Sequence, residues 1–231
     1  MAEAQSAAEG RVASGGPSGP VRASSPPAVS GTARARLFDT GLELFGTVGY
    51  EETTVQDLCR QAHVSTRDFY RQVGDRITLF RLIFEREVER NYEVVKAALL
   101  DAPPVVEVVA RRWMAAWLGS MVDEPRRYRV MYIEAHGVDR GLDERRRELL
   151  RNILQFAIVQ LRRCAEARGA EPDALFDLAA MAVAAATREM LQQYMEGALA
   201  EFEPGDIVEM FTRLAVLAEA HWPESDAGED G

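Results

Sequence analysis

The feature that most constrains this chain is the spacing of its apolar side chains, which recur every three or four residues from Ala33 onward. Phe38, Leu42 and Phe45 fall at i, i+4 and i+7, the spacing of a helix that buries one face. No run of alternating apolar and polar residues bounded by turn residues competes with this pattern. The sequence therefore predicts an all-α protein.

Two short helices are expected after the first, because a capping residue stands in front of each apolar repeat. Thr54 precedes a second repeat, which stops at a turn at His63–Val64. Ser65, with Asp68 three residues later, is placed to cap a third helix, and Gly74 is placed to end it.

A long fourth helix is expected to open at Asp75, and five further helices are expected beyond the Pro103–Pro104 break. Glycine and proline residues separate the later repeats from one another. The expected helices lie near Val105–Met121, Pro125–Ala135, Asp143–Arg168, Asp173–Leu199 and Gly205–Ala220.

The segment Thr53–Phe80 combines two short helices and a tight turn, which is the helix-turn-helix design for reading the major groove. Phe69 and Val73 must face the core, so the polar groups of the third helix stay outside. Hydroxyl, guanidinium and phenol groups suit base edges and phosphates. The side chains expected on this outer face are Ser65, Thr66, Arg67, Tyr70 and Arg71, with Arg76 at the start of the next helix.

The charge of this segment differs from that of the whole chain. Across residues 58–74, three arginines oppose only Asp68, a local net charge of +2, while the chain carries −10. A local basic surface can act inside an acidic protein, so the total charge excludes only a protein that coats nucleic acid without specificity.

These residues resemble the amino-terminal domain of the TetR family of bacterial regulators. The family pattern consists, in order, of Leu-Phe, Gly-Tyr, Thr-Thr, Ala-Gly-Val-Ser, Tyr-x-His-Phe and Lys-x-x-Leu. Over roughly residues 33–80 the matching positions are Leu37–Phe38, Leu44–Phe45, Gly49–Tyr50, Thr53–Thr54, Ala62–Ser65, Tyr70–Val73, and Arg76 with Leu79.

The resemblance implies a role for each matched position. Thr54, Tyr70 and Arg76 would hold backbone phosphates, and Thr66, Arg67 and Arg71 would enter the groove. Among the departures from the pattern, His63 stands where the family has a turn glycine. Either this turn needs no positive φ, or it carries strain. The other departures are Gln72 for a common His, Val73 for a larger Phe, and an acid at Asp68, for which helix capping is the preferred role over contact with a cytosine amino group.

The second half of the chain carries aromatic and methionine side chains at helical spacing. Such residues are usually plain core, but a ligand cavity is also apolar with a few placed polar groups. The resemblance implies an effector site in this region. The candidate effector-binding residues are Trp113, Trp117, Tyr128, Met131, Tyr132 and Arg188.

The small side chains of Leu178–Ala186 favour close helix contact. Together with the apolar repeat Ile207–Ala218, they predict two helices of a four-helix bundle in a homodimer, and ordinary packing within one chain is the alternative. This apolar window is too short to span a membrane, so no membrane partner is expected.

The sequence thus predicts four parts: a disordered extension (1–30), a helix-turn-helix DNA-binding domain (31–80), a helical effector-binding and dimerisation domain (81–222) and an acidic tail (223–231). The expected protein is a cytoplasmic, sequence-specific transcriptional regulator that binds double-stranded operator DNA. The resemblance to the TetR family implies a repressor that is released from DNA by an unknown apolar or amphipathic small molecule. A helical dimeric interaction protein without DNA binding and an all-α enzyme are the rival classes. No cofactor or metal is expected, because no Gly-rich phosphate loop and no Cys/His metal spacing occurs.

Overall fold

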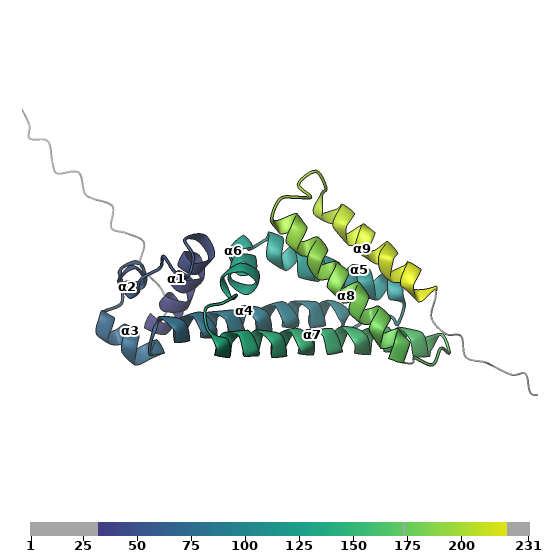
Figure 1. Ribbon diagram of the computed structural model, residues 1–231, viewed down its shortest axis with the longest axis horizontal. Coiled ribbons are helices and arrows are strands. Elements are labelled where there is room, and N and C mark those ends of the chain that lie inside the picture. Colours follow the sequence, from purple (N-terminus) through teal and green to yellow (C-terminus); the bar gives the residue numbers. More distant parts are fainter. Residues whose placement is uncertain (1–31, 173, 221–231) are drawn as a thin grey trace, which may run out of the picture. The chain divides into compact units, whose positions relative to one another are not determined.

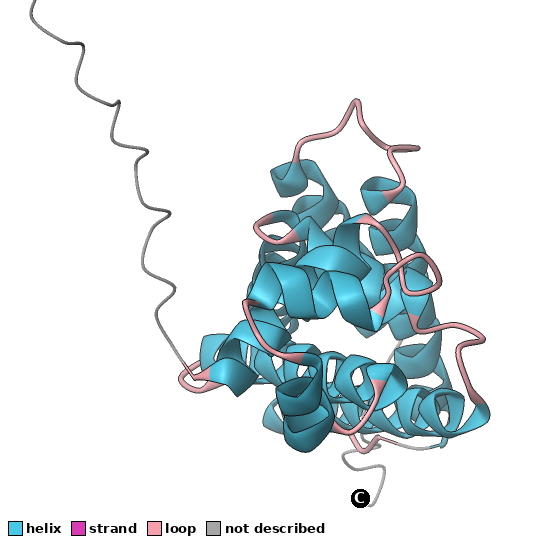
Figure 2. Cartoon of the chain, turned by 90° about the vertical axis from the view of Figure 1, so that its left-hand side faces the viewer, coloured by secondary structure: helices cyan, strands magenta, loops and turns pink. Residues whose placement is uncertain are grey.

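The computed structural model describes residues 32–172 and 174–220, and all regular structure within these ranges is helical (Figure 1, Figure 2). The all-α fold that the apolar spacing predicts is therefore confirmed. The extension at residues 1–30 and the acidic tail at residues 223–231 lie outside the described residues, so the assignments made for them stay predictions.

Three helices make up the amino-terminal part: α1 (Ala33–Thr47), α2 (Val55–Ala62) and α3 (Thr66–Val73). Each begins at a hydroxyl side chain that accepts a hydrogen bond from a backbone N–H three residues later. These N-caps are Thr32, Thr54 and Ser65. Capping thus fixes the starts of α2 and α3 where the sequence predicts them.

An aromatic cluster fills the core of this part. The rings of Phe45, Tyr50 and Phe80 lie with centroids between 5.0 and 5.7 Å apart, in tilted or edge-to-face contact. Gly41 allows α1 to approach the long helix Arg76–Leu99 closely, because a Cβ atom at Gly41 would collide with the end of the Ile83 side chain. Helices α1 to α3 are therefore held to the long helix by a solid apolar core.

Helix α4 (Arg76–Leu99) belongs to both halves of the chain, and Asp75 caps its start by accepting from the N–H of Thr78 at 2.8 Å. Its first turns pack against α1 and α3, and it then runs beside α5 (Val106–Val122) and α7 (Arg140–Ala167) (Figure 1). One rigid element thus connects the two predicted domains.

The second half continues with α6 (Pro125–Tyr128), the π-helix η1 (Arg129–Glu134), α8 (Ala174–Met195) and α9 (Pro204–Glu219). Helix α9 packs along α5, and α8 contacts both α7 and α9. The helix predicted over Pro125–Ala135 is in fact a short α-helix that widens into η1. Apolar spacing cannot separate an α-turn from a π-turn, which holds one more residue.

No helix in the part of the chain that the structure describes is long and apolar enough to cross a membrane.

Candidate nucleic-acid interface and effector cavity

Helix α3 separates its side chains into a buried and an open face. Phe69 is fully buried and Val73 is 5% exposed, so both lie in the core under the helix. Thr66 and Arg67 are exposed, and Tyr70 is 54% exposed although it is a large ring. The structure therefore gathers the predicted groove-facing residues on one accessible side of α3.

Asp68 lies within this open face and is engaged locally. It accepts a hydrogen bond from the Ser65 hydroxyl at 2.7 Å, and it forms an ion pair with Arg71 one turn later. The Asp68 carboxylate therefore supports the Ser65 cap through the Ser65 hydroxyl, and not through the reciprocal backbone hydrogen bond that Asp57 makes in α2. The same ion pair holds the Arg71 guanidinium against the helix, whereas Arg67 has no such partner among the described residues.

The turn between α2 and α3 places His63 in the left-handed region, with φ 51° and ψ 50°. Of the two expectations for this position, the turn that carries strain is the one observed. In the left-handed conformation, the Cβ atom of any residue other than glycine lies close to the following carbonyl oxygen, which is the source of the strain. The expectation that His63 avoids a positive φ is therefore wrong.

Two predicted phosphate contacts lie at the start of α2 and α4. The exposed Thr54 caps α2 in a reciprocal box with Asp57, whose pKa is held below its usual range by the hydrogen bonds from Thr54. Arg76 is half-buried. Its Nη1 donates to the carbonyl oxygens of Tyr50, Glu51 and Thr53 at 2.8–3.3 Å, and its guanidinium lies over the Tyr50 ring. Arg76 thus fixes the loop that carries Thr54, and its contact with phosphate stays a prediction.

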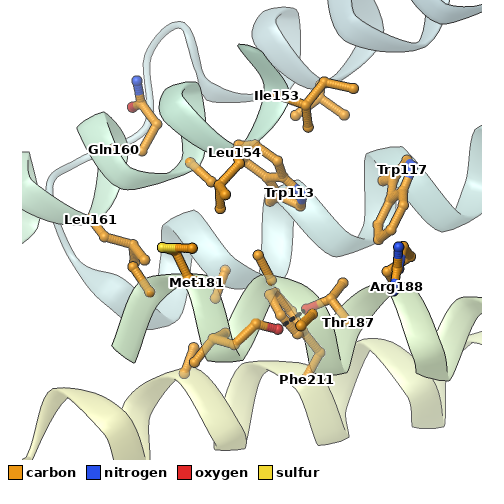
Figure 3. Close-up of a pocket in the computed structure, with 18 of the residues that line it drawn as sticks. Trp113, Trp117, Ile153, Leu154, Gln160, Leu161, Met181, Thr187, Arg188 and Phe211 are labelled. Atoms are coloured by element: carbon orange, nitrogen blue, oxygen red, sulfur yellow. Dashed lines mark hydrogen bonds between the residues drawn. The ribbon is translucent and has the colours of Figure 1, made fainter. Parts of the chain in front are cut away.

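A cavity of about 340 Å³ lies inside the second half of the chain, between α4, α5, α7, α8 and α9. Trp113, Trp117, Tyr132 and Arg188 line it, four of the six residues predicted for an effector site. Most of its wall is apolar, and Figure 3 shows Gln160 and Arg188 at opposite ends of the view. Gln160 Oε1 is buried without a hydrogen-bond partner among the described residues.

A second cavity of about 220 Å³ shares Tyr132, Leu150, Ile153 and Arg188 with the first. Met131, the fifth predicted residue, lines this smaller space. Tyr128, the sixth, is buried and stacks on Tyr132 with centroids 5.3 Å apart, but it lines neither of these two cavities.

Burial raises the pKa of Tyr132 to about 12, and a hydrogen bond from the Trp117 indole offsets part of this shift. The phenol is therefore neutral at physiological pH. Its O–H remains available as a donor where the two cavities meet.

Sequence reasoning missed Arg146, which lines the smaller cavity and whose buried Nε has no hydrogen-bond partner in the part of the chain that the structure describes. A signal was present: Leu142, Arg146, Leu149 and Ile153 follow one another at intervals of three or four, so the arginine interrupts the apolar stripe of α7. A cation at an apolar position of an amphipathic helix is a reason to look for an anion.

The segment α6–η1 connects these cavities to α1. Met131 and Tyr132 of η1 line cavity walls, while Arg129 and Glu134 of the same turn face the end of α1. Arg129 donates to the Thr47 carbonyl oxygen at 2.6 Å, and Glu134 accepts from the Tyr50 N–H at 2.8 Å.

Further contacts hold α6 on both sides. Arg126 forms an ion pair with Glu43 of α1, and Gly46 leaves the backbone of Arg126 room to approach α1. On the other side, Arg127 donates to the fully buried Glu87 of α4 at 2.9 Å. The segment is therefore bonded to α1 and to α4 at once.

Comparison with known proteins gives consistent results. Residues 37–81 match the sequence model described as "Bacterial regulatory proteins, tetR family". Over 145 residues the chain is 28% identical to the HTH-type transcriptional regulator BetI from Escherichia coli, a match that covers 54% of this chain and 73% of that protein.

Two solved structures share the fold. One is a TetR-like transcriptional regulator from Rhodococcus sp. RHA1, with a TM-score of 0.66 and 18% identity, covering 82% of this chain and 96% of that one. The other is the fatty acid degradation regulator FadR from Bacillus halodurans, with a TM-score of 0.69 and 15% identity, covering 81% of this chain and 96% of that one.

Proposed function

Because the chain belongs to the TetR family of bacterial transcriptional regulators, we propose that it is a repressor that a small-molecule effector releases from operator DNA. The observation that carries this proposal is the pairing of an open polar face on α3 with a hollow second domain. The segment α6–η1 lines the cavities and is hydrogen-bonded to the end of α1 and to the Tyr50 N–H.

DNA reading is assigned to α3. Arg67 is free to reach a guanine edge, which a guanidinium fork can contact with two hydrogen bonds. Arg71 can do the same once it leaves Asp68, so Arg67 is the stronger candidate for base contact. Thr54 and Tyr70 are proposed to contact phosphates, with Ser65 and Thr66 beside them at the start of α3. Arg76 is proposed to position Thr54.

Effector action is assigned to the cavities. A ligand that fills them changes the packing around Tyr132 and Met131, which lie on η1. The same turn holds the end of α1 through Arg129 and Glu134, so a shift of η1 reaches the DNA-binding helices directly. The ligand can move the DNA-binding equilibrium only by the difference in its affinity for the two states.

Homodimer formation is assigned to α8 and α9, since members of this family typically dimerise and a two-fold dimer reads two half-sites. Apolar side chains are exposed on both helices, with Leu178 at 59%, Met210 at 57% and Leu217 at 64%. A soluble chain rarely leaves such residues clustered in water.

The repressor proposal is tested with the DNA that flanks the gene of this protein, in gel shifts at one fixed salt concentration. The chain should shift a fragment that contains an inverted repeat, and Arg67→Ala should weaken that shift. Arg140→Ala is the matched control, because Arg140 is exposed on α7 and its ion pair among the described residues is with Glu144 one turn away. If the unmodified protein, Arg67→Ala and Arg140→Ala bound every fragment equally, the proposal that this protein reads DNA sequence would be wrong.

The dimer is tested with Ala182→Arg, measured by light scattering. Ala182 is exposed on α8 and does not line the larger cavity, unlike Ala185, so the change leaves the cavity wall intact. The variant should be a monomer with unchanged helix content. A dimer of normal size would move the interface away from α8.

A further inference from the structure

The two adjoining cavities differ in the chemistry of their lining residues, and this difference indicates which class of ligand fits them. The larger one is walled by apolar side chains of five helices and is suited to a hydrocarbon chain. The smaller one contains Arg146 and Arg188, with His136 and Gln192 on the same wall. Neither cavity has an aspartate or glutamate among the described residues that line it.

We propose that the joined cavities bind an anionic amphiphile, with a carboxylate head between Arg146 and Arg188 and an unbranched apolar chain in the larger cavity. This inference rests on the proposed function, in which these cavities form the effector site. It names the ligand class and two head-group residues that family membership does not supply.

The surroundings of Arg146 and Arg188 support a ligand with an anionic head group. Arg146 Nε is buried without a hydrogen-bond partner among residues 32–172 and 174–220, and an Asp143 carboxylate oxygen lies 4.0 Å from it. Arg188 makes no hydrogen bond or ion pair with any other described residue. Both guanidinium groups are charged and can donate to an anion. The cost of a buried donor without an acceptor applies to Arg146 alone, because Arg188 is exposed. A carboxylate supplies acceptors to both side chains at once.

The position of Arg188 sets the orientation of the ligand. Arg188 lines both cavities, so it lies where they meet, beside Tyr132. In Figure 3 Trp117 and Arg188 lie at one side of the cavity, and the apolar side chains of Leu154, Leu161 and Met181 lie at the other side, nearer Gln160. Arg146 and Gln160 are 14 positions apart on α7, which corresponds to roughly 21 Å along a helix. The combined space is therefore elongated, as a chain with a polar head requires.

A cationic ligand fits this site less well. Trp113, Trp117 and Tyr132 are aromatic, and aromatic faces can hold an ammonium group. An ammonium there would also meet two arginines with no carboxylate in the lining to balance them. Like charges repel, and Arg146 Nε is buried, so the two arginines favour a negatively charged ligand over a positively charged one.

The test is direct binding, followed through the fluorescence of Trp113 and Trp117 and through calorimetry, with full-length protein and no DNA. The probes share one chain length and are used below their micelle concentrations: dodecanoate, dodecyl phosphate, dodecanol and dodecyltrimethylammonium. Dodecanoate should bind most tightly. Tighter binding of dodecyl phosphate would show that the head group is a phosphate and overturn the carboxylate assignment.

Variants locate the head group. Arg146→Met and Arg188→Met should each weaken dodecanoate roughly tenfold to a hundredfold, the usual effect of losing a hydrogen bond to a charged group. They should leave dodecanol unchanged. Arg151→Met is the matched control, because Arg151 is exposed on α7 and lines neither cavity, and it should bind dodecanoate as the parent does.

The proposal is overturned if dodecanol or dodecyltrimethylammonium binds as tightly as dodecanoate, or if both arginine variants behave like Arg151→Met. A separate measurement isolates the proposed function. If dodecanoate binds as expected but leaves operator affinity unchanged, the ligand assignment stands and release from DNA is wrong. If no probe binds while operator binding persists, the ligand class is wrong and DNA reading stands.

Discussion

The DNA-binding helices and the second domain of this chain use their apolar residues in different ways. In α1 to α3 and the start of α4, aromatic rings fill a core with no cavity among those described above. In α5 to α9, aromatic and aliphatic side chains instead surround two cavities of about 340 and 220 Å³. A filled core favours one conformation, whereas a cavity lets a ligand stabilise one of several.

The same contrast appears in the polar groups. In the DNA-binding domain, side chains accept hydrogen bonds from the free backbone N–H groups at the helix starts, as those of Thr54 and Ser65 do. The second domain leaves Arg146 Nε, Gln160 Oε1 and Arg163 Nε buried without a hydrogen-bond partner among the described residues. Such atoms destabilise a chain unless a ligand or water completes them, so they mark the domain that is built to bind something.

The largest effect is expected where the two regions join. Glu87→Leu should lower the free energy of unfolding by about 3–5 kcal/mol, because it leaves the buried Arg127 without its carboxylate. The double variant Glu87→Leu/Arg127→Met should recover most of this loss, since an apolar pair replaces an ion pair at little cost.

Urea unfolding of both variants at one protein concentration checks this expectation. Equal losses in the single and the double variant would show that packing, and not charge, explains the role of the pair.

The difference between two truncations, one in each core, should separate the solid core from the hollow one. Phe80→Ala should cost about 3–5 kcal/mol, because a buried ring leaves a void in a filled core. Leu154→Ala should cost only about 1 kcal/mol, because Leu154 is half-buried and already faces a cavity. Urea unfolding at matched protein concentration measures both. Similar losses at the two positions would contradict the contrast between the domains.

The DNA-binding domain was more predictable from the sequence than the cavities, for a physical reason. Caps such as Ser65 and the apolar repeat that buries Phe69 are local signals, so the helix limits and the open face of α3 followed from spacing. The cavities depend on side chains from five helices. Arg146 and Tyr128 show the consequence, since the first was missed and the second was included although it lines neither cavity.

The smallest effect concerns the turn before α3. His63→Gly should stabilise the chain by up to about 1 kcal/mol, because glycine removes a left-handed strain of roughly 1–2 kcal/mol while adding backbone entropy to the unfolded state. His63→Ala keeps the strain and should bring no gain. A thermal midpoint that falls for His63→Gly would show that the imidazole supports the turn.

The central claim, that this chain reads DNA sequence through α3, is tested most directly by selection from a pool of random DNA duplexes at fixed salt. We expect enrichment of an inverted repeat with half-sites about one or two helical turns apart. Arg67→Ala should lose preference at one position of each half-site, at a cost of roughly 1–3 kcal/mol, while Tyr70→Phe weakens all sequences alike. Failure of the folded, dimeric protein to enrich any sequence, or an unchanged preference in Arg67→Ala, would contradict it.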